Sequence, residues 1–163
     1  MKTNKLTSSL IIGALATIPY ELLTTLFKLT GYTRYSVYEL SSLMITLNRP
    51  NRLLGAILSM NLGAIIALIL YFLVIGRFGW ENIVFKSVFL NLQSWILLEV
   101  LFMWLIEGRN LIPFRSISDY YAQLTSAIFF GVILGLLFEK YLNPYGEDCP
   151  GRQKKTTPPG KGR

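Results

Sequence analysis

The chain contains no histidine and only one cysteine among its 163 residues. The absence of histidine excludes Ser-His and Cys-His nucleophilic pairs and every histidine metal ligand. A single cysteine, Cys149, excludes an intramolecular disulfide and a multi-cysteine metal site. No glycine-rich phosphate loop follows a strand pattern. We therefore predict no catalytic residues, no metal, no cofactor and no enzymatic activity.

Charged residues are also scarce. They make up 15% of the chain, against about a quarter in a typical soluble domain, whereas hydrophobic residues make up 52%. The remaining charge is unbalanced, because 16 Lys and Arg outnumber 9 Asp and Glu and give a net charge of +7. The basic residues lie in loops and tails. Two properties of membrane proteins explain this: cytoplasmic loops are rich in Lys and Arg, and anionic lipid headgroups attract these residues. We expect a lipid bilayer as partner and no nucleic acid.

Four long apolar runs take up most of the sequence. A bilayer's hydrocarbon core is about 30 Å thick, so a helix needs about 20 residues to cross it. Each run reaches this length, and a single domain of residues 1–142 contains all of them. We predict an all-α polytopic membrane protein, a bundle of four transmembrane helices, with spans at about residues 6–27, 53–75, 83–106 and 120–138.

The first run also has features of a secretory signal peptide, because Lys2 and Lys5 precede it and Ala14-Leu15-Ala16 matches a small-residue cleavage pattern. The apolar run continues beyond this point, so we expect it to remain as a span. Four spans place both termini on one side of the membrane. The basic residues of the two sides nearly balance, and Lys86 adds one to the side of the termini. We expect cytoplasmic termini in a bacterial cytoplasmic membrane.

The loop between the first two runs carries a helix signal of its own. Ser36 and Glu39 fit a capping box, in which two side chains satisfy backbone N–H groups at a helix start. The apolar residues that follow share one face, and Asn48-Arg49-Pro50-Asn51 ends the run. We predict a short amphipathic interfacial helix over about residues 36–47. It is either a connector whose apolar face rests on lipid or an element for partner docking or gating.

The end of the chain has a different composition. Residues 151–163 consist largely of Pro, Gly, Lys and Arg and offer almost nothing to bury. Such a segment cannot offset the entropy lost on ordering. We predict a disordered basic tail over residues 143–163, held near anionic lipid headgroups by its charge.

Small residues recur at a four-residue spacing in three of the four runs. Helices in lipid associate by close backbone approach, which small side chains permit. The positions predicted to make such contacts are Gly13, Gly55, Ser59, Gly63, Gly131 and Gly135. This pattern indicates a tight bundle or an oligomer.

Two carboxylates lie inside the apolar runs, where a charged residue costs about 2.5–3.5 kcal/mol and normally faces the protein interior. Counted inward from the first and third loops, Glu21, Glu99, Asn61 and Gln123 lie within about 12 Å of the same membrane face. These four residues form the candidate intramembrane polar or ion site. Pro19 removes a helix hydrogen bond just before Glu21 and predicts a kink there.

Two interpretations of Glu21 and Glu99 stay open. As structural residues, both are protonated and donate hydrogen bonds to neighbouring helices. The chain is then a small membrane protein that forms a homo-oligomer or serves as an accessory or scaffolding subunit of a membrane complex. As functional residues, both bind a proton or a cation, and the chain is a coupled small transporter or channel. Glu107, Arg109 and Asp119 are interpreted as solvated loop charges, without the spacing of a lipid-modifying active site.

Overall fold

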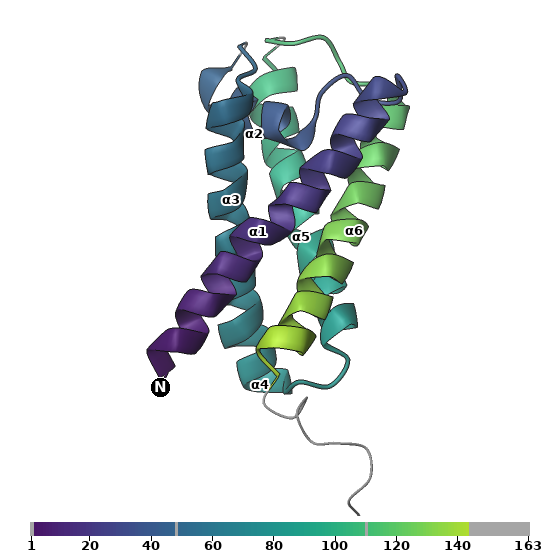
Figure 1. Ribbon diagram of the computed structural model, residues 1–163. Coiled ribbons are helices and arrows are strands. Elements are labelled where there is room, and N and C mark those ends of the chain that lie inside the picture. Colours follow the sequence, from purple (N-terminus) through teal and green to yellow (C-terminus); the bar gives the residue numbers. More distant parts are fainter. Residues whose placement is uncertain (1, 48, 110, 144–163) are drawn as a thin grey trace, which may run out of the picture.

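The computed structural model describes residues 2–47, 49–109 and 111–143, with side chains from residue 5 onward. Within these ranges every regular element is helical (Figure 1). The elements are α1 (Lys2–Leu29), α2 (Val37–Thr46), α3 (Arg52–Ile69), η1 (Leu70–Ile75), α4 (Gly76–Phe78), α5 (Ile83–Phe102), η2 (Met103–Glu107) and α6 (Ile117–Tyr141). The segments η1 and η2 are π-helical and continue α3 and α5 without a break. Apart from Asn143, the predicted tail lies outside the described residues.

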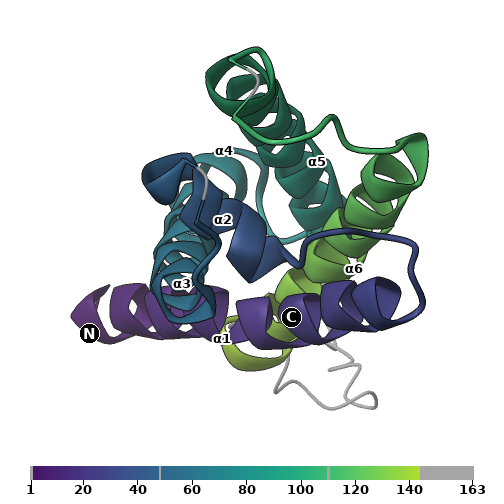
Figure 2. The same cartoon turned by 90° about the horizontal axis from the view of Figure 1, so that it is seen from above.

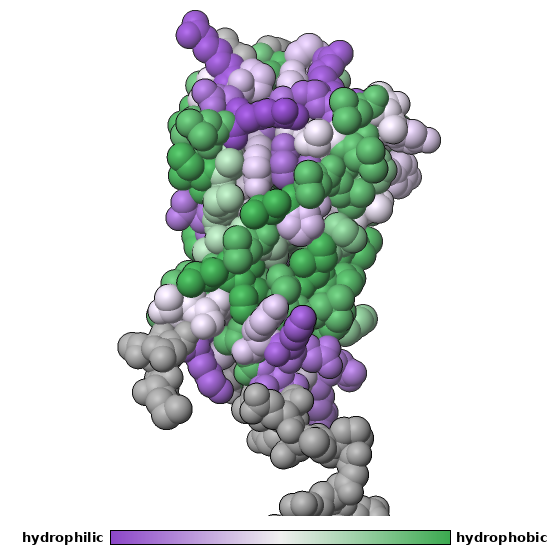
Figure 3. Space-filling view, viewed as in Figure 1, coloured by the Kyte–Doolittle hydropathy of each residue, from purple (hydrophilic) through white to green (hydrophobic). Residues whose placement is uncertain are grey.

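Four helices of the described chain are long and apolar enough to cross a membrane. They cover Lys5–Leu29, Arg52–Phe78, Ile83–Glu107 and Ile117–Tyr141. Each predicted span lies within one of these helices, so the prediction of four helices of spanning length is confirmed. On the face shown in Figure 3, hydrophobic side chains cover the middle of the bundle and hydrophilic side chains gather toward its two ends.

The four long helices alternate in direction. The start of α1 and the end of α6 therefore lie at the same end of the bundle, which we call the terminal end (Figure 1). The opposite end, here the loop end, carries α2 and the connection between η2 and α6 (Figures 1 and 2). At the terminal end, the Lys86 Nζ donates hydrogen bonds to the Phe78 and Gly79 carbonyl oxygens at 2.8 and 3.1 Å. Lys86 thus reaches toward the end that the sequence predicted.

Glycine contacts join the long helices in pairs. Gly13 of α1 and Gly63 of α3 lie back to back, and a Cβ added at Gly63 would lie 2.5 Å from the Gly13 carbonyl oxygen. A Cβ added at Gly131 of α6 would lie 2.7 Å from the Val88 Cα of α5. Gly135 of α6 approaches Val84 of α5 in the same way. Because these contacts all lie within one chain, the small residues form the bundle itself, and no separate oligomer is needed to explain them.

The helix α2 is where the capping box predicts it. Ser36 accepts a hydrogen bond from the Glu39 backbone N–H, and the Glu39 carboxylate accepts one from the Ser36 N–H. Leu43 of the apolar face is fully buried and packs in a cluster with Phe102, Ile106 and Ile112. The part of the apolar face around Leu43 therefore packs against the rest of the chain, whereas Leu47 of the same face is exposed.

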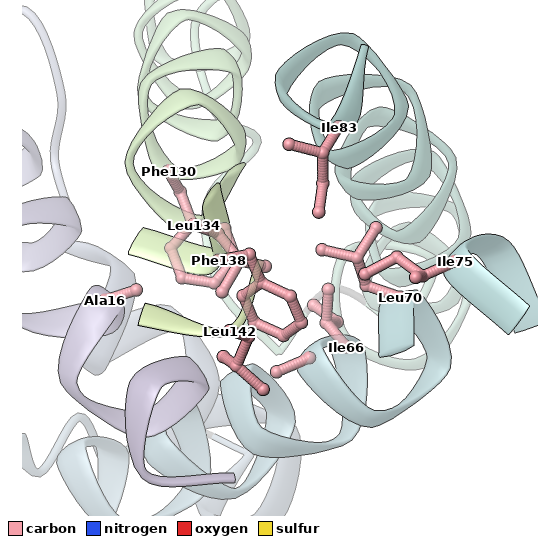
Figure 4. Close-up of a cluster of buried hydrophobic side chains, with 10 residues drawn as sticks. Ala16, Ile66, Leu70, Ile75, Ile83, Phe130, Leu134, Phe138 and Leu142 are labelled. Atoms are coloured by element: carbon pink, nitrogen blue, oxygen red, sulfur yellow. The ribbon is translucent and has the colours of Figure 1, made fainter. Parts of the chain in front are cut away.

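Two apolar cores hold the bundle together. The cluster around Leu43 closes the loop end, and a larger cluster lies toward the terminal end. In the larger cluster, three side chains of α6 pack between the other long helices (Figure 4). They are Phe130, Leu134 and Phe138. The space between the two cores is where the polar side chains of the bundle meet.

Candidate functional site

Arg115 forms the centre of a buried charged cluster at the loop end. Its side chain is 1% exposed, although it lies on the connection between η2 and α6. The Nε group donates a hydrogen bond to the Glu107 Oε1 at 2.5 Å, and an Nη group pairs with the Glu99 Oε1. The guanidinium also lies 4.5 Å from the centre of the Phe102 ring and 4.7 Å from that of Tyr120. One cation is thus held by two carboxylates and two aromatic faces.

The charges of the cluster keep Arg115 ionised. Burial lowers the pKa of the guanidinium, but the carboxylates of Glu99 and Glu107 raise it by more, so that the pKa lies above its ordinary value. The positive charge is therefore present throughout the pH range in which proteins fold. With both carboxylates ionised, one positive and two negative charges give this group a net charge of −1.

The π-helical segment η2 aligns the two carboxylates. Along an ideal α-helix, eight residues would turn Glu107 about 80° away from Glu99. The turn of a π-helix is wider, because its hydrogen bonds run from residue i to i+5, and this brings Glu107 back toward the side of Glu99. Glu107 is 2% exposed, and its second oxygen accepts a hydrogen bond from the Tyr120 hydroxyl at 3.0 Å. Both Glu107 oxygens therefore have partners.

Asp119 ties the start of α6 to the first loop. Its Oδ2 accepts a hydrogen bond from the Ser116 backbone N–H at 3.1 Å, as in a capping box, and its Oδ1 accepts one from the Arg34 backbone N–H at 2.7 Å. Asp119 and Glu107 are both buried. The interpretation of these two residues as solvated charges is therefore wrong, whereas Arg109 is exposed as expected.

A hollow runs beside the cluster, between the two apolar cores. It consists of two cavities of about 70 and 60 Å³. They share the lining residues Tyr20, Val37, Ser41, Leu62, Trp95 and Leu98. The cavity nearer the loop end reaches Glu99, Arg115 and Gln123, and the other reaches Asn91 and Ala127 near the middle of the bundle. The helix α2 covers the hollow at the loop end, since Val37 and Ser41 belong to it.

Two of the four predicted site residues meet at this hollow. Glu99 and Gln123 both line the cavity nearer the loop end. The Glu99 side chain is 15% exposed, and of its two oxygens only Oε1 is bound, to Arg115. Gln123 is buried and donates a hydrogen bond to the Tyr35 carbonyl oxygen at 3.4 Å.

The other two predicted residues lie elsewhere. Glu21 accepts hydrogen bonds from the Thr25 hydroxyl at 3.2 Å and from the Tyr38 backbone N–H at 3.0 Å, so its carboxylate holds the first turn of α2. This position suits a carboxylate because the start of a helix is electropositive. Asn61 is exposed on the outside of α3, where its amide binds the Ile57 carbonyl oxygen. The structure therefore does not bring the four predicted residues together, and α1 continues through Pro19 to Leu29.

Sequence reasoning missed the central role of Arg115. The residue lies in a loop, eight positions after Glu107. Helix periodicity predicts contacts only between residues of the same helix, and this helix ends before Arg115. A capping signal at Ser116 and Asp119 was available in the sequence and locates the start of α6. Among the described residues, no group of three acidic or cysteine side chains is arranged to hold a metal ion.

Comparison with known proteins identifies no relative. No protein-family model, curated protein or solved structure matches the chain. The function is therefore argued from the geometry of the cluster and the hollow.

Proposed function

We propose that the chain is a multi-pass membrane protein whose four long helices cross the bilayer with cytoplasmic termini. Support comes from the length and composition of the helices and from the polar ends of the apolar surface (Figure 3). The cost of exposing helix backbone in lipid is small, because the N–H and C=O groups in the interior of a helix are bonded to one another.

Within the membrane, we propose that the chain is a small proton- or cation-coupled carrier that uses Glu99. One observation carries this proposal: Glu99 is the carboxylate of the cluster that faces the hollow and keeps one oxygen unbound. Glu107, in contrast, has both oxygens engaged, by Arg115 and Tyr120. A proton or cation that reaches the hollow therefore has one acceptor in the cluster available to it.

The charge of the cluster supports this role. A net charge of −1 is costly in a low-dielectric interior, and the uptake of one proton or monovalent cation neutralises it. Arg115 is the ionisable group that pairs with Glu99, and Glu107 shares this arginine with it. Tyr20 of α1 lines the hollow from the opposite side, and no ionisable side chain of α2 or α3 lines it. The structure does not place Glu21 in this group, so the pair of carboxylates expected from the sequence is reduced to one.

Flux into reconstituted vesicles tests the carrier. A trapped pH indicator reports proton entry, and replacement of external Na⁺ or K⁺ separates proton flux from cation flux. We expect Glu99→Gln to abolish flux and Glu21→Gln to retain it, because Glu21 serves α2. Flux that is unchanged in Glu99→Gln, or no flux above that of empty vesicles, would falsify the proposal.

A role as an oligomer or as an accessory subunit is the second candidate, and the outer face of α5 favours it. The span Ile83–Glu107 is the least buried of the four, with 17% of its window inside the protein. Large side chains are exposed along it, including Phe85, Phe89, Leu97 and Trp104. Such a face offers area for a second copy or for a membrane partner. Neither candidate function involves a catalytic step.

Cross-linking tests this second role. In a Cys149→Ser background, Leu97→Cys places a thiol on the exposed face of α5, and Leu22→Cys places a matched thiol on the exposed face of α1. We expect bifunctional cross-linkers to capture a dimer or a partner through position 97 in native membranes. A chain that stays monomeric with both thiols rules this role out.

A further inference from the structure

Two residues that line the hollow each carry a buried hydrogen-bond donor without a partner in the described part of the chain. The donors are the Trp95 Nε1 and an Nη group of Arg115. Both residues line the cavity nearer the loop end. An unsatisfied buried donor is costly and rare, and it points to a group that supplies an acceptor.

The charge of the surroundings restricts what that acceptor can be. Arg115 is already balanced by Glu99 and Glu107, so an added carboxylate or phosphate would place a third negative charge beside one cation. An ammonium group offers only donors and leaves both free N–H groups unsatisfied. An uncharged acceptor, such as an ester or ketone carbonyl, satisfies a buried donor and adds no charge.

The size and lining of the hollow also restrict which other groups the bound compound can carry. Each cavity corresponds to the volume of about two water molecules, which admits a small head group but no complete lipid. Leu62 of α3 and Leu98 of α5 line both cavities and are half-buried. In Figure 2, α3 and α5 are set apart, while α1 crosses α3 and lies beside α6. Leu62 and Leu98 are therefore the lining residues between which we place the exit of a hydrocarbon chain.

We propose that the hollow binds the uncharged carbonyl head of a lipid-soluble molecule, which enters from the bilayer between α3 and α5. Trp95 or Arg115 donates a hydrogen bond to the carbonyl oxygen, and the hydrocarbon tail remains in the lipid. This inference rests on the proposed membrane insertion and names the class of molecule that the carrier would move. Binding itself does not require that Glu99 take up a proton.

Tryptophan fluorescence in vesicles tests this binding, because the chain has three tryptophans and Trp95 is the one at the hollow. The double variant Trp80→Phe/Trp104→Phe keeps Trp95 as the reporter. The matched control Trp80→Phe/Trp95→Phe keeps Trp104, which is exposed on the outer surface. The quencher is the methyl ester of a dibrominated fatty acid, and the free acid and the corresponding long-chain amine serve as charged probes.

We expect the ester to quench Trp95 in a saturable manner and at a lower mole fraction than it quenches Trp104. The unbrominated ester should reverse this quenching, and Leu62→Phe, which narrows the entrance, should remove the saturable part. Equal quenching of Trp95 and Trp104 overturns the inference, as does stronger quenching by the acid or the amine. Ester binding without flux would instead contradict the carrier, and flux without ester binding would contradict only this inference.

Discussion

At the scale of single residues, the charged cluster at the loop end depends on one arginine. Arg115 is the only cation that contacts Glu107 among the described residues, and it also holds the Oε1 of Glu99. A buried ion pair stabilises a protein little more than two apolar residues in its place would. The loss of only one partner is costly, because it leaves the other charge buried and uncompensated. The same residue thus sets both the stability of the loop end and the availability of Glu99.

We therefore expect Arg115→Met to destabilise the protein strongly. Removal of the cation leaves the buried Glu107 and the partly buried Glu99 without a positive charge, and the loss of one partner of a buried pair costs about 3–5 kcal/mol. Thermal unfolding in detergent, followed by circular dichroism, measures the change. Arg109→Met removes an exposed charge from the same loop and should change stability by less than about 0.5 kcal/mol. Equal effects of the two substitutions would show that the cluster does not stabilise the fold.

A second substitution separates loss of charge balance from loss of packing. In Arg115→Met/Glu107→Gln, one of the two stranded carboxylates is also neutralised. We expect the double variant to unfold at a higher temperature than Arg115→Met alone, because one uncompensated charge has been removed. A double variant no more stable than the single one would assign the effect of Arg115 to its contacts with Phe102 and Tyr120.

At the scale of elements, α2 is held over the hollow by groups of α1. Glu21 binds the Tyr38 N–H, the Thr24 hydroxyl accepts a hydrogen bond from the Val37 N–H at 3.2 Å, and the Lys28 Nζ lies 2.6 Å from the Glu39 carboxylate. The Ser41 and Ser59 hydroxyls join α2 to α3 at 2.8 Å. These contacts hold the first half of α2 to α1 and α3, above the hollow that α2 covers at the loop end.

Glu21→Gln should loosen α2 without unfolding the bundle. Loss of the negative charge beside the start of a helix costs about 0.3–1 kcal/mol, which allows α2 to open more often. In a Cys149→Ser background, the buried Ser42→Cys reports this opening by its rate of reaction with a maleimide. We expect faster labelling when Glu21→Gln is present and no change with Glu81→Gln, a substitution in an exposed loop. Unchanged labelling would mean that other contacts suffice to hold α2.

The contact between α5 and α6 depends on the absence of side chains at two positions of α6. A Cβ at Gly131 or Gly135 would meet backbone atoms of Val88 or Val84, which cannot move aside without shifting α5. We expect Gly131→Leu to destabilise the bundle by about 1–3 kcal/mol or more. Gly76→Ala is the matched control, since its Cβ would have no atom closer than 3.9 Å. Thermal unfolding in detergent compares the two, and similar values would contradict the packing argument.

At the scale of the whole molecule, the proposed topology has a direct test. The second loop lies at the terminal end and the third loop at the loop end, and the proposed topology puts these two loops on opposite sides of the membrane. In intact cells, an impermeant maleimide should label Arg109→Cys and should label Glu81→Cys only after the membrane is opened, both in a Cys149→Ser background. The reverse pattern would place the termini outside, and equal labelling of both would contradict four spans.

Much of the architecture was determined by the sequence alone. A run of about 20 apolar residues satisfies its backbone within a helix wherever it lies, so the four long helices follow from composition. The capping box at Ser36 also follows from local rules, because it depends on neighbouring positions along one helix. The four-residue spacing of Gly13, Gly63 and Gly131 indicates which helix faces permit close approach, but not which helices meet there. Only the tertiary structure decided which polar groups meet. Arg115 contacts Glu99 and Glu107 because of the path of a loop and the π-helical turn of η2, and Glu21 binds the backbone of α2. These contacts depend on distances in space, which the spacing of residues along the chain does not predict.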